Sequence, residues 1–411
     1  MKTPDLWLGS ESIWHDDRGT FEPGWIIIRG TRIVALAAPG DTPAAGAQVR
    51  NLGPLRVLPG LINTHVHLEF SGGTEPLRDF YAEDDFERLL RATRNAHHLL
   101  MSGVTTVRDC GSSWSMLALA RRPDLSPLPL PRLLCSGPPI TVPRGHLHFM
   151  HGVVRSEADI SAHVDRIEHE GGQSVKVMAS GGKLTPGSDP ARTVFSQRRL
   201  DLIVALAREK GYPSVSHVLA SESIRRSALA GFDSLEHCAF MERNDEGHLQ
   251  RVYDGDIAQT VRDCGNHVMA NLSTTTNRFE RLRAQAQRTP AEDDLLRHFD
   301  DKIDTFRRLA ELGIPMVCGT DSGVLEAPFD ETWREVAYLV RSGLSHAEAI
   351  RAATSRAAKA LRLEGKTGRI APGLSADLVA IANNPLADET AFAKPRLVVL
   401  RGRTVLDRIA A

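Results

Sequence analysis

The feature that most constrains the fold is a long alternation of short apolar runs with amphipathic helical segments, from residue 58 to about residue 365. The runs have the length of buried strands. They lie at residues 61–65, 104–107, 132–135, 174–178, 213–217, 233–237, 267–270 and 314–318. Helical periods between them include residues 84–101, 157–170, 196–210 and 295–312. Because strands that alternate with helices form parallel sheets, the pattern predicts an α/β fold, a (β/α)8 barrel of the TIM type.

The two ends of the chain have a different character. Residues 6–57 contain short strands with glycine turns and no helical period, and a similar pattern returns at 376–381 and 396–400. We therefore predict that residues 1–57 and 366–411 combine into a small β-sandwich lobe, and that residues 58–365 form the barrel. A chain of 411 residues is long enough for both, since single cores rarely exceed about 300 residues.

Charge and cysteine content exclude several classes of protein. With 50 Lys and Arg against 51 Asp and Glu, no broad field attracts nucleic acid or an anionic membrane, so the expected partner is a small-molecule substrate. Five cysteines without C-x-x-C spacing indicate reduced core thiols in a cytoplasmic protein. Met1–Asp5 lacks the layout of a signal peptide, and the chain contains no apolar run of membrane-spanning length.

The first apolar run of the barrel ends in two histidines, His65 and His67, separated by Val66. Side chains alternate between the faces of a strand, so the two imidazoles point the same way. Two histidines of this spacing also occur in ordinary strands, so the decision between ligand and structural residue depends on the other strand ends. In a barrel of this type the working residues lie at those carboxyl-terminal ends.

The other strand ends complete a set that is typical of a metal centre: Lys176, His217, His237 and Asp321. A buried lysine loses its proton and can add carbon dioxide, which makes it an anionic carbamate with two oxygen ligands. We expect one divalent ion at His65, His67 and Asp321 and a second at His217 and His237, with carboxylated Lys176 and a hydroxide between them. Zinc suits such nitrogen and oxygen ligands best. The alternative for Lys176 is an ion pair inside the barrel.

Several motifs together resemble the amidohydrolase superfamily, and within it the imidazolonepropionase-related branch that contains Xaa-Pro dipeptidase-like enzymes. They are Pro59-Gly60-Leu61 before His65-Val66-His67, Val175-Lys176-Val177-Met178-Ala179-Ser180-Gly181-Gly182, Ser216-His217-Val218, Leu235-Glu236-His237, Gly319-Thr320-Asp321-Ser322-Gly323 and the closing Gly368–Leu378 segment. The resemblance covers nearly the whole chain. It implies the same six metal ligands and the hydrolysis of an amide or a related bond. A metal-bridging hydroxide would attack the carbonyl carbon, and Asp321 would accept its proton and deliver it to the leaving amine.

The resemblance also implies that a histidine after the third strand lies over the substrate carbonyl, and His146 occupies that position. This chain departs from the family's Gly-Gly-His pattern, because Arg144 replaces the first glycine. We assign His146 a catalytic role. Further candidates for substrate binding are His148 and His151 in the same loop and Lys183 and Arg192 after the fourth strand, all of which can equally be solvated surface residues.

Glu236 precedes His237, and strand alternation places it on the opposite face, where a structural or supporting role is expected. Two other functions stay open at this point. One is a mononuclear deaminase or cyclic-amide hydrolase on the same barrel, with an unmodified Lys176. The other, which an intact ligand set disfavours, is a non-catalytic scaffold. A homo-oligomer is expected by analogy alone.

Overall fold

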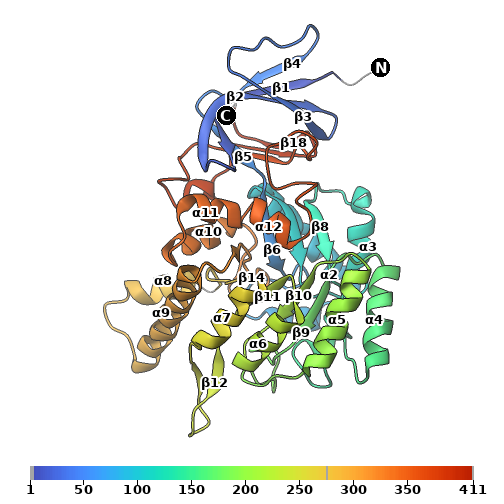
Figure 1. Ribbon diagram of the computed structural model, residues 1–411, viewed down its shortest axis with the longest axis vertical. Helices are drawn as coiled ribbons and strands as arrows, with labels where there is room; N and C mark the ends of the chain where they lie inside the picture. Colours follow the sequence, from blue (N-terminus) through green and yellow to red (C-terminus); the bar gives the residue numbers. More distant parts are fainter. Residues whose placement is uncertain (1–3, 275, 410–411) are drawn as a thin grey trace.

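The computed structural model describes residues 4–274 and 276–409. A β-rich lobe lies at the top of Figure 1, and a larger body of strands and helices lies below it. The predicted lobe limits at residues 1 and 411, and Met1–Thr3, lie outside the described residues. Within the described part of the chain, no helix combines the length and the apolar character needed to cross a bilayer.

Strands from both ends of the chain form the lobe. They are β1 (Leu6–His15), β2 (Thr20–Arg29), β3 (Arg32–Ala37), β4 (Gln48–Asn51), β5 (Arg56–Pro59), β16 (Leu378–Ile381), β17 (Leu397–Leu400) and β18 (Arg403–Asp407). They make one eight-stranded sheet in the order β18-β17-β16-β5-β1-β2-β3, with β4 beside β1. The antiparallel pairing of β5 with β16 joins strands from the two ends of the chain.

The lobe differs from the expected β-sandwich, because its described strands belong to a single sheet. The reason is the ten-residue strand β1, which pairs with β2 along one edge and with both β4 and β5 along the other. Strand β5 extends to Pro59, so the lobe sheet continues slightly beyond the predicted limit at residue 57. Gly60 then leads directly into the first strand of the body.

All eight predicted strands of the body are present and parallel to their neighbours. Strands β6 (Leu61–Val66), β7 (Val104–Asp109) and β8 (Arg132–Cys135) form one sheet. The second sheet contains β9 (Val175–Met178), β10 (Ser214–His217), β11 (Ser234–Glu236), β14 (His267–Met269) and β15 (Met316–Val317). The two sheets are linked at both edges, by the bridges Ile140–Val177 and Val66–Ser322.

Helices cover the outside of these strands (Figure 1). Their bounds are α1 (Pro76–Ala82), α2 (Asp85–Met101), α3 (Met116–Arg121), α4 (Glu157–His169), α5 (Gln197–Glu209), α6 (Ser221–Ala230), α7 (Gly255–Cys264), α8 (Thr276–Ala284), α9 (Pro290–Glu311), α10 (Thr332–Arg341), α11 (His346–Ala352) and α12 (Ser355–Ala360). The four helices expected from periodicity are present. Helix α9 begins earlier than expected, because Thr289 and Glu292 form a capping box that starts it at Pro290.

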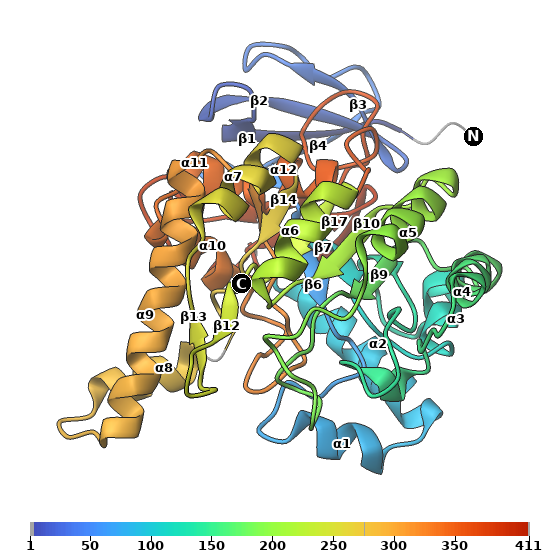
Figure 2. The same cartoon turned by 60° about the horizontal axis from the view of Figure 1, so that its bottom comes forward.

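Two elements outside the sheets of the body build the wall of the cavity described below. One is the hairpin of β12 (Met241–Arg243) and β13 (Leu249–Arg251), which was not expected. The other is the pair of α8 and the expected helix α9, which extends away from the sheets in Figure 2. Of the five cysteines, all unpaired, four are buried as expected, and Cys264 is exposed at the end of α7.

Candidate active site

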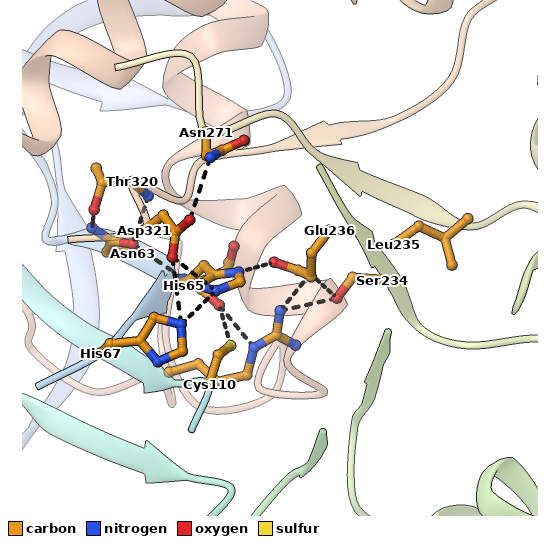
Figure 3. Close-up of polar contacts among 12 residues, drawn as sticks. Asn63, His65, His67, Cys110, Ser234, Leu235, Glu236, Asn271, Thr320 and Asp321 are labelled. Atoms are coloured by element: carbon orange, nitrogen blue, oxygen red, sulfur yellow. Dashed lines mark hydrogen bonds and ion pairs between the residues drawn. The ribbon is translucent and has the colours of Figure 1, made fainter. Parts of the chain in front are cut away.

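The side chains of His65 and His67, at the end of β6, and of Asp321, after β15, meet in one cluster, shown in Figure 3. The Nε2 atoms of His65 and His67 are 3.3 Å apart, and each lies 3.4 Å from Oδ1 of Asp321. The backbone of Asp321 is left-handed, with φ of 57°, and its N–H donates to the carbonyl of His65, which fixes the carboxylate there. Ligands about 2.1 Å from a tetrahedral ion lie about 3.4 Å apart, so the three atoms have the spacing of one metal site.

A second group of side chains lies beside the first. The rings of His217 and His237 have centroids 4.6 Å apart, and the ring of His65 is 5.3 Å from that of His237. Ligand atoms of His65, His237 and Asp321 all lie within 4.8 Å of one another. Lys176 is 1% exposed, and its Nζ has no hydrogen-bond partner among the described residues. A buried lysine without a partner is unfavourable as an ammonium, and this orphan atom fits conversion to a carbamate.

Burial controls the protonation of these groups. It lowers the pKa of His67 to about 4 and, with the positive charges nearby, keeps the imidazoles neutral. It also lowers the pKa of Lys176. Burial raises the pKa of Asp321 to about 6, against the opposing effect of Lys176 and Lys302. Neutral imidazoles are the form that binds metal, and a lowered lysine pKa favours the amine that adds carbon dioxide, so the donor set fits divalent cations.

Glu236 supports the cluster from inside the sheet. Its Oε2 accepts a hydrogen bond from Nδ1 of His65 at 2.5 Å (Figure 3). Its Oε1 accepts hydrogen bonds from Arg108 and Ser234. The supporting role agrees with expectation, but the placement on the face opposite His237 was wrong. His237 has φ of 74°, which ends the strand geometry and turns its imidazole to the same interior. Glu236 therefore orients His65 so that Nε2 faces the metal site.

A cavity of about 490 Å³ opens onto this cluster. Five of the six expected metal ligands line it, namely His67, Lys176, His217, His237 and Asp321. His146 lines it as well, and the hydroxyl of Thr185 contacts its Nδ1 at 3.0 Å. Because that hydroxyl accepts a hydrogen bond from the N–H of Leu147, its proton is available to Nδ1. This leaves Nε2 of His146 as the protonated nitrogen, free to donate into the cavity.

The remaining loop candidates separate into two groups. Lys183 lines the cavity and is solvent-exposed at its mouth. The cavity lining does not include His148, His151 or Arg192. Nδ1 of His148 contacts the carbonyl of Gly145, while His151 and Arg192 lie on the exposed surface. The structure therefore does not bring these three to the site, and their assignment to substrate binding stays a sequence prediction.

Five polar residues of the cavity were not anticipated: Arg251, Asn271, Thr274, His298 and Lys302. Arg251 comes from strand β13 and Lys302 from helix α9. The sequence did contain a signal for the lysine. Leu295, Phe299 and Lys302 follow helical spacing on one face of α9, and a cation on an otherwise apolar face is unusual. All three line the cavity.

A cavity at the ends of parallel strands, with paired histidines, a buried lysine and a carboxylate, is the arrangement of a metal-dependent hydrolase. Comparisons with known proteins agree. The profile of the amidohydrolase family matches residues 56–405, so the chain belongs to this family and is a hydrolase of C–N bonds.

Individual relatives are distant but cover most of the chain. The ochratoxinase of Aspergillus niger is 24% identical over 370 residues, which is 83% of this chain and 73% of that protein. A Xaa-Pro dipeptidase crystallised with methionine in its active site superposes with a TM-score of 0.84 at 24% identity, over 97% of this chain and 99% of the other. A prolidase in complex with N-methylphosphonate-L-proline has a TM-score of 0.80 at 25% identity, over 98% of this chain and 100% of the other. These neighbours agree with a TIM-barrel-type fold and with the branch that the sequence resembles.

Proposed function

We propose that the chain is a binuclear metal-dependent amidohydrolase that cleaves an amide or peptide-like bond in a small molecule. His65, His67 and Asp321 would hold one divalent cation, and His217 and His237 the other, with carboxylated Lys176 shared between them. The observation that carries the proposal is the orphan Nζ of Lys176, buried beside five metal-binding side chains. Zinc is the metal we propose, because imidazole and carboxylate ligands suit it.

Two cations at this position would lower the pKa of a water molecule and polarise the substrate carbonyl. The protein's own groups perform the remaining tasks. Asp321 accepts the proton of the attacking water and returns it to the leaving nitrogen. His146 donates from Nε2 to the carbonyl oxygen as negative charge develops on it. Glu236 holds the ring of His65 in one orientation.

The fold and the partner belong to the same proposal. We propose that the two linked sheets of the body belong to one closed (β/α)8 barrel comprising residues 58–365, with the composite lobe as a separate unit. We also propose a small-molecule substrate as the partner, without nucleic acid or membrane, because the cavity is small and the net charge is only −1. The cytoplasmic location and a homo-oligomeric assembly stay predictions.

Metal analysis combined with a substrate library tests the proposal. We expect about two divalent ions per chain and turnover of N-acyl amino acids or dipeptides. Lys176→Ala should reduce turnover by about 10³-fold or more and lower the metal content, because the shared ligand is lost. After incubation with 13C-bicarbonate, the NMR spectrum of the wild type should contain a carbamate carbon signal that Lys176→Ala lacks. Lys394→Ala, an exposed lysine outside the cavity, is the matched control.

One ion per chain together with an unmodified Lys176 would instead indicate the mononuclear deaminase or cyclic-amide hydrolase. Full turnover by Lys176→Ala would contradict the binuclear proposal directly.

A further inference from the structure

The cavity contains a second functional region, formed by three cations that the proposed reaction does not use. Lys183, Arg251 and Lys302 all line it, and among the described residues of the lining the only acidic side chain is that of Asp321. None of the three forms an ion pair within the described part of the chain. We refer to them as the cationic end of the cavity. Like charges around a small volume repel one another, so this arrangement is unfavourable without an anionic ligand.

Two of the cations are held in place by neutral groups. Nη1 of Arg251 donates to the carbonyl of Ala239 at 2.7 Å, and Nζ of Lys302 donates to the carbonyl of Asn271 at 2.7 Å. A carbonyl oxygen orients a cation without neutralising it, and each group has further donors. The backbone therefore positions these side chains while their charge stays available to a ligand.

A charge count indicates how many negative charges this region takes. Glu335 is fully buried and raises the pKa of Lys302, whereas burial, the largest effect, and the charges of Arg251 and Lys183 lower it to about 7. Lys302 is thus partly balanced by Glu335. Asp301 acts on Arg251 from the exposed surface, where solvent screens its charge. Arg251 in turn lowers the pKa of Lys183, after the larger effect of desolvation at the cavity mouth. Two cations, Lys183 and Arg251, remain without a buried counter-charge.

The cationic end lies next to Asp321. Nδ2 of Asn271 is 3.4 Å from Oδ2 of Asp321, and the carbonyl of the same Asn271 accepts the hydrogen bond from Lys302. His146, which faces the substrate carbonyl in the proposed reaction, lies instead beside His217, with ring centroids 4.7 Å apart. Because Asp321 protonates the leaving nitrogen, the cationic end is on the leaving-group side of the bond.

The wall beside Lys302 is apolar. Phe279 and Phe299 stack with ring centroids 4.3 Å apart. Leu295 lies one turn before Phe299, on the face of α9 that carries Lys302. Such a wall packs against methylene groups, which a small inorganic anion lacks. An organic anion with a short carbon chain fits the region better than phosphate or sulfate.

We propose that Lys183 and Arg251, assisted by Lys302, bind a dicarboxylate leaving group, so that the enzyme prefers amides that release an acidic amino acid such as glutamate. The inference rests on the proposed function, since it assigns one side of the scissile bond to the cationic end. It goes further by defining the charge of the released product. Arg251 presents a planar fork to one carboxylate, and Lys183 presents a point charge to the other.

Two substrates that differ only in one charge test the proposal: N-(3-phenylpropanoyl)-L-glutamate and N-(3-phenylpropanoyl)-L-glutamine. We expect the wild type to hydrolyse the glutamate compound with a kcat/KM at least about tenfold higher, mainly through KM. Lys183→Met and Arg251→Met should each bring the ratio close to one, and Arg251→Lys should retain part of it. Arg278→Met is the matched control, because Arg278 is exposed on α8 and outside the cavity lining, and it should keep the wild-type ratio.

Equal kcat/KM values for the two compounds in the wild type would overturn the subsite and leave the hydrolase intact. So would a ratio that Lys183→Met and Arg251→Met do not change. Calorimetric binding of L-glutamate and L-glutamine to the metal-loaded protein gives a readout without turnover. If neither amide is hydrolysed but glutamate binds at least tenfold more tightly and Arg251→Lys weakens it, the subsite stands and the proposed function fails. Thermal unfolding confirms that each variant is folded.

Discussion

The two ends of the cavity are built in different ways. The metal-binding end uses side chains at the ends of β6, β9, β10 and β11 and after β15, and these are nearly all buried: His65 and Lys176 are each 1% exposed. The cationic end uses a loop, a hairpin strand and a helix, and its Lys183 is open to solvent. Strand ends are fixed by the sheet on both sides, whereas loops and outer helices depend on fewer contacts.

This difference suggests a division of work. The strand ends hold the groups that react, which must stay in place to within a fraction of an ångström. The outer wall holds the groups that select the substrate. Substitutions at the metal-binding end should therefore change metal affinity and kcat, and substitutions at the wall should change KM.

The largest effect that tests this division is expected for Glu236→Gln. Glu236 accepts hydrogen bonds from His65, Arg108 and Ser234, and a glutamine has one acceptor oxygen and two additional N–H groups. The variant also leaves the buried guanidinium of Arg108 without its counter-charge. We expect metal affinity to fall about 10- to 100-fold. The free energy of unfolding should fall by about 3 to 5 kcal/mol.

Chelator competition and denaturant unfolding measure these two quantities. Glu209→Gln, on the exposed end of α5, is the control for loss of a carboxylate and should change neither. Unchanged metal affinity in Glu236→Gln would mean that the strand alone orients His65, without help from the carboxylate.

The same contrast explains what the sequence could and could not predict. The two-residue period of a strand predicts that His65 and His67 lie on one face, and their Nε2 atoms are close together. Parallel strands end at the same side of the body, where Lys176, His217 and Asp321 line one cavity. The prediction that Glu236 and His237 lie on opposite faces was wrong, because His237 has a left-handed backbone that a periodic sequence pattern does not predict. Local rules therefore suffice where the sheet imposes the geometry.

The wall could not be predicted by such rules. Arg251 and Lys302 are far apart in the sequence and meet only because the hairpin and α9 pack over the strand ends. In the loop after β8, His146 lines the cavity, while neighbouring His148 and His151 lie outside its lining. Here the direction of each side chain depends on local turns, including the left-handed residues Leu147 and His151.

A fall in kcat of about tenfold is expected for Thr185→Val. This variant tests whether a loop residue can act on the reacting groups. Valine has the shape of threonine but lacks the hydroxyl that links Nδ1 of His146 to the N–H of Leu147. Without it, His146 is no longer held with its proton on Nε2. We expect kcat to fall about tenfold, equivalent to about 1.4 kcal/mol of transition-state stabilisation, with KM and metal content unchanged.

Steady-state kinetics and metal analysis check this, and Thr185→Ser, which keeps the hydroxyl, should restore most of kcat. If serine and valine reduce kcat equally, Thr185 acts through packing and the assigned tautomer of His146 is wrong.

The smallest effect is expected from Thr289→Ala, at the start of α9. The hydroxyl of Thr289 accepts from the N–H of Glu292, and the carboxylate of Glu292 accepts in return from the N–H of Thr289. Loss of this cap should cost about 1 kcal/mol, which corresponds to about fivefold faster hydrogen exchange in the first turns of the helix if they open locally. Metal content and kcat should not change, because the strand ends do not depend on α9 for their geometry. Thr289→Ser should behave like the wild type. Unchanged exchange in the alanine variant would mean that the stacking of Phe279 on Phe299 holds the wall, and that the wall is as rigid as the strand ends it faces.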